Sequence, residues 1–231
     1  MSTATSDVDF AASPLATLRE GRLVRRLTQL FVGLGVYGVS LALLVRADLG
    51  LFPWDVLHQG LMHHVPLSFG TIVILTSVVV LLAWIPLRQW PGVGTICNAV
   101  VIGLVADVVL AVLHTPTSLL ARGVLVVSGV VLNAVATAAY IGARLGPGPR
   151  DGLMTGLVRR TGKSVRLVRT TIELSVVVVG VLLGGTIGIG TLLYAFTIGP
   201  LVHVLLPLCT VAPRPPARPT TPVTSGDSLS A

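Results

Sequence analysis

An internal repeat constrains the fold of this chain more than any other feature. The segment ADLGLFPWDVLHQGL at residues 47–61 returns 96 positions later as ARLGPGPRDGLMTGL at residues 143–157, with eight of the fifteen positions identical. At the same offset, and without a gap, the motif G-x-G-T at residues 92–95 returns at residues 188–191. Chance matches between apolar segments scatter over many offsets, whereas these share one. The chain is therefore predicted to be a duplicated unit of the kind common among membrane transporters.

The composition places this duplicated unit in a membrane. The chain is 53% hydrophobic and only 11% charged, with a mean hydropathy of +0.90. Soluble domains carry about a quarter charged residues. A net charge of +7 is explained by basic cytoplasmic loops, so no nucleic-acid partner is predicted. Cys97 and Cys209 lie in apolar segments without a CxxC partner or metal-ligand spacing, so we interpret them as packing residues.

Six apolar segments, each long enough to cross a bilayer, organise the chain. They cover about residues 27–45, 71–87, 95–113, 123–141, 167–183 and 192–208. We expect a polar and basic tail at residues 1–26, a first membrane repeat at 27–115, a second at 120–211, and a disordered Pro-rich tail at 212–231. No cleavable signal peptide is evident, since the first apolar block is long enough to remain as a span.

Positive charge predicts the orientation of these spans. With the N-terminus inside, the outer segments carry only Arg46 and Arg122 as basic residues, together with Asp48 and Asp55. All the other Lys and Arg residues, Arg26, Arg144 and Arg150 among them, lie in cytoplasmic segments. Both termini are then cytoplasmic. Because each repeat holds three spans, an odd number, the second repeat must enter the membrane from the opposite side. We therefore predict an all-α, polytopic protein of two inverted three-helix repeats, each with a short interfacial or re-entrant helix.

The short helices follow from the repeated L-G-x-x-P-x-D motif. Pro53 and Pro149 suit a first helical turn, where the missing N–H costs nothing. Asp55 and Asp151 fall in that turn and complement the helix dipole. Capping alone explains an aspartate at this place, yet a capped half-helix end is also an ion site in inverted-repeat transporters. Both interpretations stay open, and the two aspartates are the first candidates for a substrate or proton pathway.

Further ionisable and polar residues lie inside the predicted spans, where charge is costly and usually faces a polar interior. Asp107 in the third span is the repeat equivalent of His203 in the sixth. We expect the two side chains either to face each other across the two halves or to lie hydrated near the lipid headgroups. Arg169 and Glu173 are four apart and can pair on one helix. Asn98 either faces the same cavity or bonds between helices.

Other repeated positions are predicted to have structural roles, through close packing or helix starts. They are Gly50, Pro53, Gly60, Gly94 and Thr95 in the first repeat and Gly146, Pro149, Gly156, Gly190 and Thr191 in the second. We also expect the G-x-G-T segments to line the substrate pathway.

Several familiar motifs are excluded. The G-x-G-x-x-G at residues 33–38 lies inside a span with no preceding strand, and the TGKS at residues 161–164 lacks the glycine spacing of a nucleotide-binding loop. His58, His63 and His64 do not share one helical face, so no metal site is predicted. HExxH and GxSxG are absent from the sequence, so an enzyme is not expected. No cofactor is predicted either.

The repeat motifs also carry a family resemblance. LGLFPWDVLHQGL, LSFGT at residues 67–71, WIPLRQWPGVGT at 84–95 and YIGARLGPGPRDGLMTGL with RRTGKSVRLVRT at 140–170 closely resemble the YczE-type branch of the YczE/YyaS/YitT bacterial membrane proteins. The resemblance covers about residues 25–210 and implies a bacterial inner-membrane protein. It implies no agreed set of catalytic residues, and an association of some relatives with secondary-metabolite production suits export or an accessory role.

Two functions therefore follow as expectations. The first is a secondary transporter or exporter of a small organic solute, with a pathway lined by Asp55, Asp151, Asp107 and His203. The second is a non-transporting accessory factor for secondary-metabolite biosynthesis, docking through the arginine-rich loop at residues 144–169. The lipid bilayer is the expected partner in both, and the sequence leaves open a homo-oligomer or a cytoplasmic protein partner.

Overall fold

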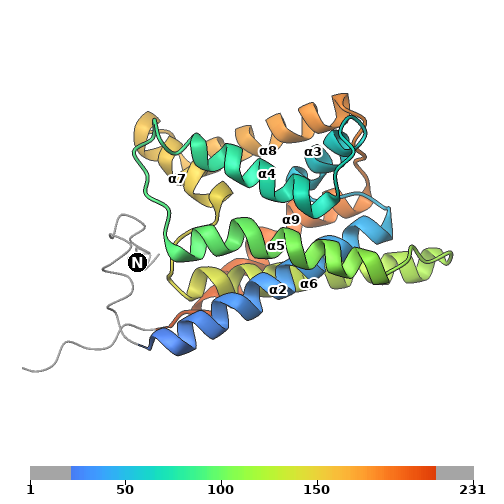
Figure 1. Cartoon of the computed structure of the whole chain (residues 1–231), viewed down its shortest axis with the longest axis horizontal. Helices are drawn as coiled ribbons and strands as arrows, with labels where there is room; N and C mark the ends of the chain where they lie inside the picture. The colour runs from blue at the N-terminus through green and yellow to red at the C-terminus, as the bar shows by residue number, and fades with distance from the viewer. Residues whose placement is uncertain (1–21, 212–231) are drawn as a thin grey trace, which may run out of the picture.

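The computed structural model describes residues 22–211, and in this range the chain forms eight helices and no strand. Figure 1 shows them in two layers, with the four longest helices in one and the four shorter ones in the other. The long layer holds α2 (Leu23–Ala47), α5 (Val93–Val112), α6 (Leu119–Gly142) and α9 (Ile189–Cys209). The short layer holds α3 (Pro53–Met62), α4 (Phe69–Leu82), α7 (Pro149–Thr161) and α8 (Val165–Leu182). Of the predicted tails, residues 1–21 and 212–231 lie outside the described residues, whereas residues 23–26 form the first turn of α2.

The long layer has the properties of membrane-spanning helices. Within residues 22–211, four helices are long and apolar enough to cross a membrane, and they are α2, α5, α6 and α9. The short layer is less clear-cut, because α4 has only 14 residues and α8 carries Arg166, Arg169 and Glu173 in its first half. The all-helical membrane protein is confirmed, whereas six spans in two inverted repeats stay a prediction.

The helices begin at positions that differ by the repeat offset. Each of the first four helices has a counterpart that starts 96 residues later, because Leu23, Pro53, Phe69 and Val93 correspond to Leu119, Pro149, Val165 and Ile189. The caps repeat as well. Ser68 before α4 accepts a hydrogen bond from the Thr71 amide, and Ser164 before α8 accepts one from the Leu167 amide, as serine N-caps do.

Contacts between the two halves are reciprocal. The Gly94 amide donates to the Leu145 carbonyl at 2.8 Å, and the Gly190 amide donates to the Leu49 carbonyl at 2.9 Å. Position 94 corresponds to 190 and position 145 to 49, so one bond is the repeat image of the other. Reciprocity of this kind is what a two-fold relation between two halves produces.

Glycine is required beside these bonds. Gly50 and Gly146 have φ values of 110° and 117°, which residues with a Cβ rarely adopt. A Cβ on Gly50 would also lie 2.6 Å from the Gly188 amide nitrogen, and one on Gly146 would lie 3.1 Å from the Gly92 Cα. The repeated glycine therefore lets the segment before each short helix approach the start of a long helix in the other half.

Two equivalent arginines join the antiparallel helices α2 and α6. Arg26 donates from Nε to the Ala143 carbonyl at 2.8 Å and from Nη2 to the Arg144 carbonyl at 2.6 Å. Arg122 donates from Nε to the Ala47 carbonyl at 2.6 Å and also binds Asp48. Each guanidinium thus binds carbonyls at the C-terminal end of the partner helix. A cation stabilises a helix at this place, because the C-terminal end is the negative end of the helix dipole. The start of each helix therefore lies beside the end of the other.

Candidate functional site

A small cavity lies between the two helix layers and is lined by residues of both halves. Its volume is about 60 Å³, enough for a few water molecules or a ligand of a few heavy atoms. Helices α2, α4, α5, α6 and α7 all contribute to the walls. The lining residues are Tyr37, Val73, Ser77, Asn98, Ile102, Thr137, Tyr140, Gly148, Arg150 and Asp151.

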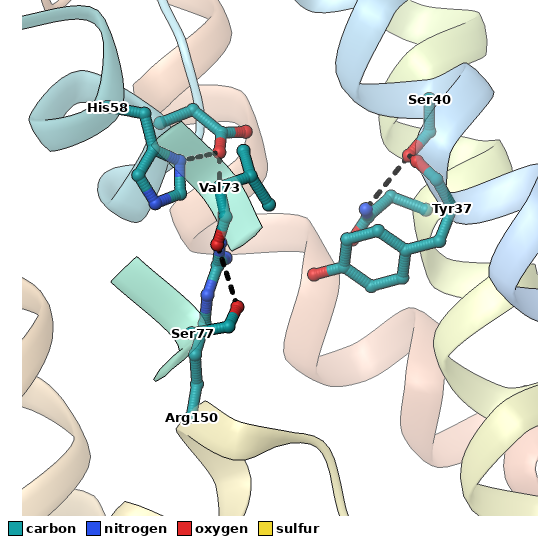
Figure 2. Close-up of polar contacts among 8 residues, drawn as sticks. Tyr37, Ser40, His58, Val73, Ser77 and Arg150 are labelled. Atoms are coloured by element: carbon teal, nitrogen blue, oxygen red, sulfur yellow. Dashed lines mark hydrogen bonds and ion pairs between the residues drawn. The ribbon is translucent and has the colours of Figure 1, made fainter. Parts of the chain in front are cut away.

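One wall comes from the crossing of α2 and α6, and its groups are uncharged. The Asn133 amide nitrogen donates to the Ser40 hydroxyl at 3.0 Å, and Tyr37 lies beside the same asparagine. The Tyr37 and Tyr140 rings meet edge to face, with centroids 6.1 Å apart. In Figure 2 the Tyr37 hydroxyl points away from α2 toward the side where Ser77 and Arg150 lie. Two phenol groups therefore face the cavity from the long layer.

The opposite wall carries the charged groups, which come from the first turn of α7. The Asp151 carboxylate accepts a hydrogen bond from the Tyr140 hydroxyl. Arg150 extends toward α3, where its guanidinium carbon lies 5.0 Å from the centroid of the Trp54 ring, a cation–π distance. Its Nη2 is 3.9 Å from Asp55 Oδ1. Burial raises the pKa of Asp151, against the opposing effects of the Tyr140 hydrogen bond and of two arginines.

Behind Arg150 lies a buried acid–base pair. Asp55 Oδ1 and His58 Nδ1 are 2.9 Å apart, and both side chains are fully buried. Burial lowers the pKa of His58, although the hydrogen bond to Asp55 opposes that shift. Asp55 Oδ2 and His58 Nε2 have no hydrogen-bond partner among residues 22–211. Figure 2 shows His58 and Arg150 approaching the same region from opposite sides.

The cavity lies where equivalent residues of the two repeats meet. Trp54 and Arg150 correspond to each other and are in contact, and the same holds for Tyr37 and Asn133. In a two-fold arrangement, only residues close to the axis touch their own equivalents. The chemistry of these pairs differs, since an indole matches a guanidinium and a phenol matches an amide. The site thus joins equivalent positions of the two repeats whose side chains differ in chemistry.

The structure brings some of the predicted pathway residues to this site. Asp151 and Asn98 line the cavity, and Asp55 lies behind Arg150. Both aspartates occupy the first turns of α3 and α7 as predicted. Neither α3 nor α7 shows a side-chain cap hydrogen bond at its N-cap residue in the described range. Those N-cap residues are Phe52 and Gly148, which have no side-chain acceptor, so a capping role of the two aspartates stays a prediction. Asp55 pairs with His58.

Other predicted pathway residues lie elsewhere. Asp107 accepts a hydrogen bond from the Gly70 amide at 2.7 Å, so it binds the N-terminal turn of α4 instead of the cavity. His203 is exposed on α9, and no bond joins it to Asp107 in the described part of the chain. Arg169 donates from Nε to Glu173 Oε1 at 2.8 Å on α8, as the spacing predicted. This pair is partly exposed.

The repeated glycine and threonine positions hold the backbone. The G-x-G-T segments begin α5 and α9, where the hydroxyls of Thr95 and Thr191 accept hydrogen bonds from the Gly92 and Gly188 amides. Thr95 also donates to the Pro147 carbonyl at 2.7 Å. Because these segments do not line the cavity, they position its walls rather than contact its contents.

The sequence interpretation missed three residues that shape the site. Arg150 was assigned only to cytoplasmic charge, and Tyr37 and His58 were not singled out as pathway candidates. One signal pointed to Arg150: it stands inside the repeated P-x-D motif, where the first copy has Trp54. Among the described residues no group of three or more His, Cys, Asp or Glu side chains could hold a metal ion.

Comparisons with known proteins define the family but not the activity. The model of a family of unknown function, DUF6198, matches residues 24–207. An uncharacterized protein of Haemophilus influenzae is 38% identical over 187 residues, covering 81% of this chain and 86% of the relative. The uncharacterized membrane protein YczE of Bacillus subtilis is 35% identical over 188 residues, covering 80% and 87%. The uncharacterized protein YyaS of the same organism is 29% identical over 181 residues, covering 77% and 90%. No solved structure matches the chain.

Proposed function

The chain belongs to the DUF6198 family and is a multi-pass membrane protein homologous to YczE, and from this premise we propose that it is a secondary transporter or exporter of a small organic solute. One observation carries the proposal. A polar cavity with Arg150 and Asp151 in its walls lies between the two layers, where residues of both halves meet. Charged groups buried in a membrane protein usually mark a substrate or ion pathway.

The repeat supports this function because two related halves allow the protein two related conformations. Inverted-repeat transporters bind their cargo where the repeats meet and expose it alternately by rocking one part against the other. The reciprocal bonds from Gly94 to Leu145 and from Gly190 to Leu49 support such an arrangement. We propose six crossings, in which α4 and α8 complete the two repeats and α3 and α7 are re-entrant.

The same arrangement agrees with cytoplasmic termini. Arg26 binds the Arg144 carbonyl, so two arginines assigned to the cytoplasm lie at one end of the molecule. Arg122 binds Asp48 at 2.7 Å, so two residues assigned to the outside lie at the other end. We propose transport rather than catalysis, since the charged side chains of the cavity are an aspartate and an arginine without a recognisable nucleophile–base pair at its surface.

The proposal is tested by comparing solutes inside and outside cells that express the wild type, a deletion or Asp151→Asn. A transporter should shift the distribution of one solute class in the deletion and in Asp151→Asn alike. Asp48→Asn is the matched control, because Asp48 is exposed at the end of α2 and asparagine tolerates its left-handed backbone. If Asp151→Asn inserts normally and distributes every solute as the wild type does, the pathway is not at this cavity.

A second candidate function has its own observation. A groove of about 750 Å³ lies beside α7 and is lined by residues 85–88, Gly156, Arg159 and Arg160. Arg160 also donates to the Pro86 carbonyl at 2.6 Å. A basic groove of this kind suits the docking of an acidic cytoplasmic partner, so the accessory factor for secondary-metabolite biosynthesis remains the alternative.

The two candidates respond to different variants. An accessory factor should fail when Arg159, Arg160 and Lys163 are replaced by glutamine, and it should tolerate Asp55→Asn and Asp151→Asn. A transporter should show the opposite pattern. The measurement is the yield of the secondary metabolite whose production requires the protein, together with the distribution of solutes in the same cultures. If the product disappears only in the basic-groove variant, the accessory function replaces transport.

A further inference from the structure

The groups around Arg150 restrict the class of cargo that the cavity can bind. Arg150 is the cation between the carboxylates of Asp55 and Asp151. On α8, Arg169 and Glu173 compensate each other. We propose that the cavity binds a small monovalent anion together with one proton, with Arg150 holding the anion and the Asp55–His58 pair holding the proton. This inference rests on the proposed transport function and names its cargo class.

The case for an anion comes from the groups that converge on the cavity. Helices α3 and α7 present their first turns to each other through Trp54 and Arg150, and α3 and α7 lie toward opposite ends of the short layer (Figure 1). Gly148, the N-cap residue of α7, lines the cavity beside Arg150. The positive ends of half-helices bind anionic groups of cargo in transporters. The phenol of Tyr37 and the amide of Asn98 complete a set of hydrogen-bond donors.

The case for a proton follows from the same inventory of charge. Asp55 and Asp151 already bring two carboxylates to one guanidinium, so a further anion at this depth needs a further positive charge. The Asp55–His58 pair can accept it without leaving the site, because both side chains are buried and His58 Nε2 is unpartnered in the described chain. When His58 is protonated, the pair is neutral overall.

Arg150 couples the two events. With His58 neutral, Asp55 carries the uncompensated charge of the pair, and Arg150 lies 3.9 Å away to balance it. With His58 charged, Asp55 has its own counter-ion at 2.9 Å, and Arg150 is released toward the cavity that it lines. Proton binding and anion binding therefore favour each other, and each must change the affinity of the other by the same factor.

Other titratable groups face this pair from the neighbouring helices. Helix α4, which packs against α3, contains none between residues 69 and 82. From α8, the facing groups are Arg169 and Glu173, which are paired. Tyr37 of α2, Tyr140 of α6 and Tyr194 of α9 are phenols, and Asp151 of α7 accepts the Tyr140 hydroxyl. Asp107 of α5 binds the α4 amide of Gly70.

Trp54 provides a reporter, since Arg150 rests on its ring. The test titrates the purified full-length protein with sodium acetate between pH 5.5 and pH 8.5 and records tryptophan emission, with sodium formate and sodium chloride as further probes. We expect a saturable change whose apparent Kd rises with pH by up to about tenfold per pH unit, as one coupled proton requires. Trp54→Phe should remove the signal, while Trp84 and Trp90 remain.

Two variants should have opposite effects. Arg150→Gln should abolish acetate binding at every pH. Asp55→Asn removes the competing carboxylate, so acetate should bind with an affinity that no longer depends on pH. Asp48→Asn should titrate as the wild type does. The inference is overturned if none of the three anions changes the emission, if binding is independent of pH in the wild type, or if Asp55→Asn loses binding as Arg150→Gln does.

Failure of this inference can be told apart from failure of the proposed function. Acetate binding without acetate uptake by proteoliposomes, under a proton gradient, would leave the anion site in place and remove transport. A solute shift in cells that depends on Asp151, combined with no anion-induced signal, would keep transport and overturn the anion–proton inference.

Discussion

The contacts that join the two halves and the cavity that they enclose differ in one respect. At the joints, equivalent residues are alike: Gly50 matches Gly146, and Arg26 matches Arg122. At the site, one pair of equivalent residues is unlike, since Trp54 matches Arg150, although Asp55 matches Asp151. The same backbone plan therefore serves both halves, while the side chain at this one position differs between them.

This difference separates residues needed for the fold from residues needed for a ligand. A joint must satisfy the same backbone groups in both halves, because buried carbonyls and amides require partners wherever they occur. If the cavity binds one ligand, as proposed, one arginine placed from one side suffices. The matched glycines and arginines of the joints are thus expected to affect stability, and Arg150, whose equivalent is Trp54, is expected to affect binding.

The largest loss of stability is expected from the repeated glycines at the joints. Gly50→Ala combines a positive φ with a Cβ 2.6 Å from a backbone nitrogen, so it should cost about 2–5 kcal/mol. Gly146→Ala should behave similarly. Gly35→Ala is the control, because its Cβ would meet nothing within 4 Å. Thermal unfolding in detergent measures the difference, and equal midpoints for Gly50→Ala and Gly35→Ala would refute the role of the joint.

The two equivalent arginines, Arg26 and Arg122, should differ in their contribution to stability, and the more buried one should contribute more. Arg26→Gln loses charge-assisted bonds to the Ala143 and Arg144 carbonyls at a site only 1% exposed, and it should cost about 2–4 kcal/mol. Arg122 has a side chain that is 23% exposed, so Arg122→Gln should cost about 1–2 kcal/mol, because water can replace part of the lost bonding. Denaturation of the two variants side by side measures this order. A larger loss for Arg122→Gln would show that burial does not set it.

The smallest expected effect is a pH dependence of stability that comes from His58, which lies behind Arg150. The pKa of His58 is lowered in the folded state from its ordinary value of 6.5, so between the two values the unfolded chain binds more protons. Stability should therefore be lost as the pH falls below about 6.5 and be level above it. His58→Gln should flatten this profile in the absence of anions. A slope that is unchanged in His58→Gln would assign the dependence to another group.

The sequence predicted the elements of this fold better than the neighbours of its side chains. The repeated P-x-D motif located the starts of α3 and α7 correctly, because proline and aspartate suit a first helical turn wherever that turn lies. The expected partnership of Asp107 with His203 rested on equivalence alone. Equivalence in sequence does not by itself bring two side chains together, and Asp107 lies beside the first turn of α4.

Arg150 shows the complementary limit. Along the sequence it is one of many arginines. It adds one positive charge to a cytoplasmic loop, whichever way its side chain points. Its role follows from the contact with Trp54 and the approach to Asp55, which come from packing between the two halves. Hydropathy carries no information about such a contact, because it treats each segment by itself.

The most direct test of the account is the accessibility of the cavity from the two sides of the membrane. Ser77 lines the cavity, so Ser77→Cys in a background with Cys97→Ala and Cys209→Ala places a single thiol there. Ala134→Cys, at a position with no exposed surface, is the control that should not react. A pathway with alternating access predicts that membrane-impermeant thiol reagents label Ser77→Cys both in intact cells and in inside-out vesicles. Labelling from neither side, or from one side only, would contradict a transport pathway through this cavity.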